Sequence, residues 1–151
     1  MARLLIVHHT PSPSLHTMLG AVQDGAGADG LEDVEVVTAA ALSCTAADVL
    51  ATDGCVLLTP ANLGTMAGAL KHFFDTIYYP CLEETRGRPY GVAVHGNSDV
   101  DGALRDIDKI TTGLGWSQAT EHVRVLDSPD ADDRDACWNL GATVAATLLE
   151  G

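Results

Sequence analysis

Hydroxyl and imidazole side chains crowd one short segment near the amino terminus, residues 7–17, which reads VHHTPSPSLHT. The segment follows a short apolar run and precedes apolar residues at helical spacing, so we expect a loop that opens a helix. The first N–H groups of a helix have no intrahelical partner and carry partial positive charge, which attracts phosphate. Loops of this kind usually contain glycine, whereas this one contains two prolines.

The loop keeps enough donors to hold a phosphate. Pro13 suits the first position of the helix, with Ser12 as its N-cap, and the hydroxyls add to the backbone N–H groups that remain. The candidate phosphate-binding residues are Thr10, Ser12, Ser14, Leu15 and His16. The same pattern also fits a capped turn without a ligand, so this segment alone leaves both interpretations open.

Two further polar segments follow apolar runs: TPANLGT at 59–65 and HGNSD at 95–99. Pro60 and Gly64 favour an irregular loop, which can present backbone N–H groups to a ligand. The first of these segments also fits a generic strand–turn–helix connection.

The elements that must position these segments alternate strictly. We expect strands at 3–8, 34–39, 54–60, 90–96 and 119–126. Helical patterns follow them, around 15–22, 45–52, 66–77 (closed by Pro80), 104–110 and 131–149. This alternation predicts an α/β fold with right-handed crossovers and a parallel sheet with helices on both faces. In the five-stranded order 2-1-3-4-5, the three polar segments converge at the carboxyl edge of the sheet, where such folds bind ligands.

The segment TPANLGTMAGALKHFFD (59–75) resembles the flavin-binding loop and following helix of the NAD(P)H-dependent FMN reductases and WrbA-type quinone reductases. The matching residues are Thr59, Pro60, Gly64, Met66, Gly68, Lys71, Phe73 and Asp75. The resemblance implies a flavodoxin-like three-layer sandwich that covers residues 1–151 as a single domain. The first loop departs from the family pattern, because proline replaces its glycine and Leu15 its final threonine.

The resemblance implies FMN as the cofactor, with its phosphate at residues 10–16. Flavin-ring contacts are then expected from Pro60, Ala61, Asn62, Leu63 and Gly64, and from His95, Gly96, Asn97 and Asp99. His95 or Asn97 would donate a hydrogen bond to flavin O2. We expect no catalytic general base and no metal site, because the cofactor carries the chemistry.

The function implied is an NAD(P)H-dependent oxidoreductase, with NAD(P)H as co-substrate and a quinone, flavin or similar small molecule as electron acceptor. The two ligand loops contain no aromatic residue, and an open flavin face suits hydride transfer. The alternatives are a flavodoxin-type electron carrier and a non-catalytic flavin-binding protein. Arg86 and Arg88 either meet the phosphates of the nicotinamide nucleotide or belong to a solvated loop, and Tyr78, Tyr79 and Trp116 are expected to pack.

Composition limits the other functions. The formal charge of −13 disfavours nucleic acid and anionic membranes as partners. No apolar run is long enough for a signal peptide core or a membrane span, so we expect a cytoplasmic protein. The four cysteines form no C-x-x-C pair, and Cys55 and Cys137 are expected to act as apolar filler. WrbA-type proteins carry an insertion that helps to build tetramers; this chain lacks it, and a homodimer remains compatible with the sequence.

Other proteins with this topology fit less well. A response-regulator receiver needs an acidic pair after the first strand, where this chain has His8 and His9. A low-molecular-weight tyrosine phosphatase needs C-x₅-R there, and a dinucleotide-binding Rossmann domain needs G-x-G-x-x-G. Both motifs are absent from that position.

Overall fold

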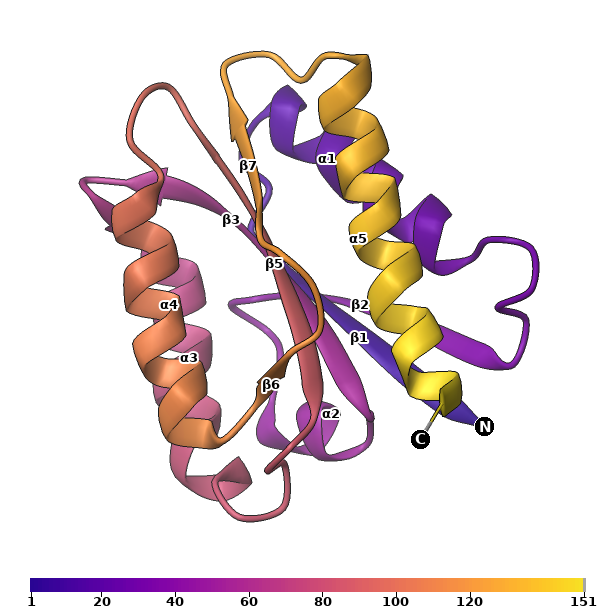
Figure 1. Cartoon of the computed structure of the whole chain (residues 1–151). Helices are drawn as coiled ribbons and strands as arrows, with labels where there is room; N and C mark the ends of the chain where they lie inside the picture. The colour runs from indigo at the N-terminus through magenta and orange to yellow at the C-terminus, as the bar shows by residue number, and fades with distance from the viewer. Residues whose placement is uncertain (151) are drawn as a thin grey trace.

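The computed structural model describes residues 1–150, whose strands form one sheet with helices on both faces (Figure 1). The strands are β1 (Ala2–His8), β2 (Val34–Ala40), β3 (Gly54–Asn62), β4 (Thr65–Met66), β5 (Pro89–Gly96), β6 (Ser117–Gln118) and β7 (Val123–Leu126). The helices are α1 (Pro13–Ala26), α2 (Ala46–Leu50), α3 (Gly68–Cys81), α4 (Asp101–Leu114) and α5 (Ala131–Glu150). The sheet runs β2-β1-β3-β5-β6, with β4 paired to β3 and β7 paired to β5. The predicted α/β fold and its central strand order are confirmed.

The central strands are buried on both faces, which explains their continuous apolar sequence. Leu4, Leu5, Ile6 and Val7 of β1 are fully buried between neighbours β2 and β3, both parallel to it. In the register of the sheet, His8 lies beside Leu58, and Pro60 lies beside His95. The carboxyl ends of β1, β3 and β5 therefore meet at one edge.

Each face of the sheet has its own core. Leu15 and Met18 of α1 and Leu140 and Val144 of α5 cover one face, together with Ile6 of β1. On the opposite face the buried side chains come from α2, α3 and α4, and they include Phe73, Phe74 and Ile107. Burying one such Leu or Phe side chain stabilises the fold by roughly 1.5–3 kcal/mol. Figure 1 shows the α1–α5 pair and the α3–α4 pair on opposite sides of the strands.

Helices α1 and α5 touch through their backbones. A β-carbon on Gly25 would overlap the carbonyl oxygen of Trp138, and one on Gly141 would overlap the carbonyl oxygen of Val22. Glycine is therefore required at both positions of this crossing. Because α1 begins at the first polar loop, the contact with α5 helps to fix where that helix begins.

Two details differ from the sequence-based expectation. The sheet has seven strands rather than five: β4 is added, and the expected strand at 119–126 is replaced by the shorter β7, with β6 just before that range. Helix α3 runs one residue past Pro80, to Cys81, and ends there because proline has no N–H and crowds the preceding turn. No helix within residues 1–150 is long and apolar enough to cross a membrane.

Candidate functional site

Three loops meet at the carboxyl edge of the sheet: residues 9–16 after β1, 60–66 at the end of β3, and 95–99 after β5. The order β1-β3-β5 makes them neighbours, and the His9 N–H donates to the Leu58 carbonyl across the first pair, at 3.0 Å. The structure thus brings together the segments that carry all the predicted site residues. They lie at the upper end of the strands in Figure 1.

The first loop is a capped helix N-terminus. Ser12 is the N-cap of α1, with Pro13 in the first turn, and its Oγ accepts from the Leu15 N–H at 3.3 Å. The His16 N–H donates to the Ser12 carbonyl at 3.1 Å. The N–H groups of Leu15 and His16, two of the candidate phosphate-binding residues, are therefore engaged within the helix. Ser14 keeps both its N–H and its hydroxyl without a protein partner in residues 1–150.

Imidazole groups surround this loop. The Nδ1 atom of His8 shares a 3.1 Å hydrogen bond with the Thr10 hydroxyl. Burial lowers the pKa of His8, and the nearby His16 and His9 lower it further. An anion bound beside His8 would favour the protonated form of that ring. The loop therefore offers hydroxyls, a helix N-terminus and imidazole groups together.

The second loop is a tight hairpin rather than the irregular loop that the sequence predicts. Asn62 of β3 pairs with Thr65 of β4, so only Leu63 and Gly64 form the turn. Both have positive φ, 51° and 80°, as a type I′ turn requires. The Leu63 side chain is fully exposed at the tip. The turn lies at the carboxyl edge of the sheet, next to the other two loops.

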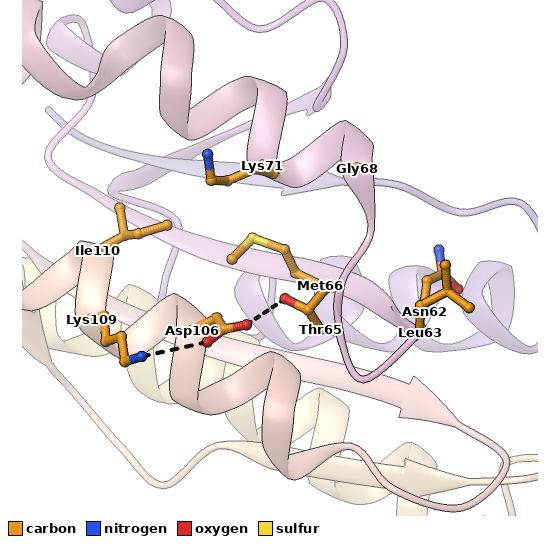
Figure 2. A pocket seen from close by; sticks show the side chains of 9 residues that line it. All are labelled: Asn62, Leu63, Thr65, Met66, Gly68, Lys71, Asp106, Lys109 and Ile110. Carbon is orange, nitrogen blue, oxygen red and sulfur yellow. Dashed lines mark hydrogen bonds and ion pairs between the residues drawn. The ribbon is translucent and has the colours of Figure 1, made fainter.

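Helix α4 holds this hairpin in place. The Thr65 hydroxyl donates to Asp106 Oδ2 at 2.6 Å, and Lys109 Nζ lies 4.0 Å from Asp106 Oδ1 (Figure 2). A β-carbon on Gly102 would overlap the Gly64 carbonyl oxygen, so the turn rests directly on the first turn of α4. Inside the hairpin, the Thr59 hydroxyl accepts from the Ala67 N–H at 3.1 Å.

Sequence reasoning missed Thr65, Gly102 and Asp106. Asp106 lies 41 residues beyond Thr65, and only the packing of α4 against the hairpin brings the two together. A glycine in the first turn of a helix was the one visible signal, because glycine weakens helices and usually needs a packing reason there.

The third loop offers two side chains without a hydrogen-bond partner in residues 1–150, those of Asn97 and Ser98. The His95 Nε2–H donates to the Asp127 carbonyl oxygen at 2.7 Å, so this N–H is engaged within the protein. Asp99 Oδ1 accepts from the Asp101 N–H at 3.0 Å at the start of α4. Gly96 is required by packing, since a β-carbon there would lie 2.8 Å from Val100 Cγ1. Asn97 is exposed and has no hydrogen-bond partner in residues 1–150.

Other residues considered from the sequence lie away from this edge. Arg88 donates to the carbonyls of Val49 and Thr52, at 2.8 and 2.6 Å, and Arg86 lies beside Gly115, both near the amino-terminal end of β5. They are therefore at the opposite end of the sheet from the three loops. Trp116 is buried and donates to Thr85 Oγ1 at 2.9 Å, which makes it a packing residue as expected.

All four cysteines are free and buried. Cys55 and Cys137 lie inside the two cores, as expected for apolar filler. Burial raises the pKa of the Cys137 thiol to about 12, and it also raises that of Cys55. Both thiols are protonated at neutral pH, so neither provides a thiolate nucleophile.

Comparison with known proteins shows which solved structures have a similar fold. No protein-family model matches the chain, and no curated protein sequence matches it. The chain is similar in structure to a flavodoxin from the domain Archaea (TM-score 0.84, 16% identity, 97% of this chain and 99% of that one). It is also similar to a WrbA-like flavodoxin from Agrobacterium tumefaciens (TM-score 0.80, 17% identity, 99% of each chain). A flavodoxin from Streptococcus pneumoniae TIGR4 is similar as well (TM-score 0.79, 21% identity, 97% of this chain and 99% of that one).

These likenesses extend over nearly the whole of each chain, so no large segment of either partner lies outside the shared architecture. Together with the strand order and the helices on both faces, they show that the chain has the flavodoxin-like fold.

Proposed function

We propose that the chain is an FMN-binding flavoprotein that oxidises NAD(P)H and passes the electrons to a small acceptor such as a quinone or a free flavin. The observation that carries this proposal is the meeting of the 59–75 motif and a capped helix N-terminus at one edge of the sheet. FMN has a phosphate at one end and a planar, hydrogen-bonding ring at the other. The two loops offer complementary groups for both ends.

The phosphate end would lie at the start of α1. Ser14 contributes an uncommitted N–H and hydroxyl, and the Thr10 hydroxyl lies beside His8. The partial positive charge of the α1 N-terminus adds to these donors. With fewer free N–H groups than a glycine-rich loop, the site relies more on hydroxyl and imidazole groups.

The ring would lie against the Leu63–Gly64 turn, with the 95–99 loop on its other side. Both turn residues have positive φ, Leu63 is fully exposed at the tip, and the Asn97 amide has no hydrogen-bond partner in residues 1–150. The flavin, when bound, supplies the two-electron chemistry. The chain's own part is to bind and orient it, and no side chain is required to move a proton.

An electron carrier is the second candidate, because structurally similar proteins include flavodoxins. The enzyme is favoured by the ligand loops, which place no aromatic side chain over the site and leave room for a substrate. A flavin-binding protein without turnover is the third.

The purified full-length chain should be titrated with FMN and with riboflavin, following flavin fluorescence. We expect FMN to bind at least tenfold more tightly than riboflavin, because only FMN carries the phosphate. Oxidation of NADH and NADPH with menadione as acceptor should then show steady turnover. Reduction only by a separate reductase would identify a carrier, and a chain that takes up no FMN would overturn the proposal.

A further inference from the structure

A cavity of about 530 Å³ lies on the α3–α4 side of the hairpin. Figure 2 shows its walls: Thr65 and Met66 of β4, Lys71 of α3, and Asp106, Lys109 and Ile110 of α4. Small-molecule sites in proteins usually measure roughly 300–1,000 Å³ and are mainly apolar with a few placed polar groups. The cavity therefore has the size and the lining of a ligand site. It borders the expected flavin-ring site at Asn62 and Leu63, but the function proposed above assigns no ligand to the space between α3 and α4.

The interior of the cavity is apolar. Met66 forms part of the α3–α4 core, and Ile110 packs at the edge of that core. Gly68 contributes no side chain, and a β-carbon there would meet nothing within 4 Å, so the space beside it is open. An apolar or aromatic body of one or two rings would bury this surface, at roughly 25 cal/mol per Å² of apolar area.

The rim carries two lysines whose hydrogen-bonding capacity is largely unused. Lys71 Nζ makes one 2.7 Å bond to Asp75, and Lys109 Nζ lies 4.0 Å from Asp106 without a hydrogen bond to any residue in 1–150. An ammonium group has three N–H donors, so each lysine can donate a further hydrogen bond to an anionic partner. The carboxylates beside them are committed: Asp106 to the Thr65 hydroxyl and Asp75 to Lys71.

The charge balance at this rim differs from that of the whole chain. The whole chain carries a formal charge of −13, with only 8 lysines and arginines. At this rim two cations lie beside two carboxylates, so the local formal charge is close to zero rather than strongly negative.

We propose that this cavity is a second ligand site, which binds a small apolar anion such as an aromatic carboxylate. Met66 and Ile110 would contact its ring, and Lys71 and Lys109 its carboxylate. The proposal does not depend on FMN binding, because Met66, Lys71, Lys109 and Ile110 are not among the residues expected to contact FMN. Asn62 and Leu63 also line the cavity and are shared with the expected flavin-ring site. A second copy of the chain docking over the cavity is the competing occupant.

The test uses the full chain with 2-naphthoate and its neutral analogue 2-naphthamide, each with and without added FMN. Methyl resonances of Met66 and Ile110 should shift on titration, with naphthoate binding at least fivefold more tightly than naphthamide. Lys71→Gln together with Lys109→Gln should remove that preference but keep naphthamide binding. Arg86→Gln, at the opposite end of the sheet, is the control for loss of one positive charge.

Ile110→Trp, which fills the cavity, should weaken both probes at least tenfold while circular dichroism and the melting temperature show a folded chain. Unchanged affinity in Ile110→Trp, or no preference for the anion in the wild-type chain, would overturn the proposal. Shifts that follow protein concentration rather than probe concentration would identify the second copy instead and would also overturn it. Probe binding in a chain that takes up no FMN would refute the proposed function alone.

Discussion

The Thr65 hydroxyl donates a 2.6 Å hydrogen bond to the Asp106 carboxylate, and this bond joins the β3–β4 hairpin to helix α4. The hairpin is short and lies at the end of the sheet, so few other contacts determine its position. The Gly64 carbonyl oxygen rests on Gly102, four residues before Asp106 on α4, so two adjacent residues of the hairpin contact the same helix. Asp106 therefore acts as a positioning residue for the expected flavin-ring site.

Removing this bond should loosen the turn and weaken FMN binding. We expect Asp106→Ala to raise the Kd for FMN about fivefold to tenfold, because a hydrogen bond to a charged group is lost at a half-exposed site. Asp106→Asn should stay close to wild type, since the amide oxygen still accepts from Thr65. Flavin fluorescence titration measures both.

Asp75→Asn is the matched control, because Asp75 pairs with Lys71 on α3 and touches neither Thr65 nor Gly64. Equal FMN affinity in Asp106→Ala and Asp75→Asn would show that the contact with α4 does not position the site.

The contact between Gly64 and Gly102 predicts opposite effects of two Gly→Ala changes. Gly102→Ala forces a β-carbon into the Gly64 carbonyl, so we expect a loss of about 1–3 kcal/mol in the free energy of unfolding and weaker FMN binding. Gly20→Ala, in α1, meets nothing within 4 Å and should stabilise the chain by about 0.5–1 kcal/mol. Urea denaturation measures both; a Gly102→Ala chain as stable as Gly20→Ala would contradict the close packing.

Substitutions at Ser12 and Ser14 should distinguish a residue that stabilises the helix from one that binds the ligand, within the same loop. Ser12 caps α1, so Ser12→Ala should cost about 0.5–2 kcal/mol of stability, and Ser12→Asp should recover most of it. Ser14 has no protein partner, so Ser14→Ala should leave the melting temperature nearly unchanged and weaken FMN binding several-fold. The same titration with riboflavin should show no effect of Ser14→Ala. A Ser14→Ala chain that binds FMN normally would place the phosphate elsewhere.

The pH dependence of stability should carry a contribution from His8. Its pKa is lowered in the folded chain, so the unfolded chain binds the proton more readily and protonation favours unfolding. The contribution of His8 to stability is therefore present above its unfolded pKa, near 6.5, and is lost as the pH falls through its lower folded pKa. Denaturation at several pH values should show this loss.

Two variants test whether the neighbouring His16 lowers the pKa of His8. His16→Gln removes a neighbouring positive charge, so a histidine NMR titration should show the pKa of His8 moving back toward its ordinary value. His72→Gln, on α3, should leave the pKa of His8 where it is. Added phosphate should raise the pKa of His8. A pKa of His8 that stays the same when phosphate is added would argue against an anion site at this loop.

The sequence predicted the central strands and the capped start of α1 well, because continuous apolar runs and a Ser-Pro helix start are local signals. It failed at residues 119–126, where the apolar pattern continues but the pairing does not. There only residues 123–126 pair with β5, as β7, and His122 just before them contacts Asp108 of α4 at 2.9 Å. A tertiary contact of this kind leaves no periodic signal.

The hairpin was missed for a different reason. Type I′ turns are normally recognised by Asn-Gly or Asp-Gly, and a leucine at φ 51° is disfavoured on its own. Packing of the turn on α4 stabilises the positive φ values that the local sequence does not favour. For the same reason, the sequence located the three ligand loops but not the residues that hold them.

The β3–β4 hairpin borders two candidate ligand sites, the cavity beside α3 and α4 and the expected flavin-ring site. Asn62 and Leu63 line the cavity beside α3 and α4, and the same residues belong to the turn expected to meet the flavin. A ligand that restricts this turn from one side changes the conformational freedom left to the other. By thermodynamic reciprocity, each ligand must then alter the affinity of the other by the same factor. The tip of the hairpin thereby connects two binding equilibria through residues that both ligands would contact.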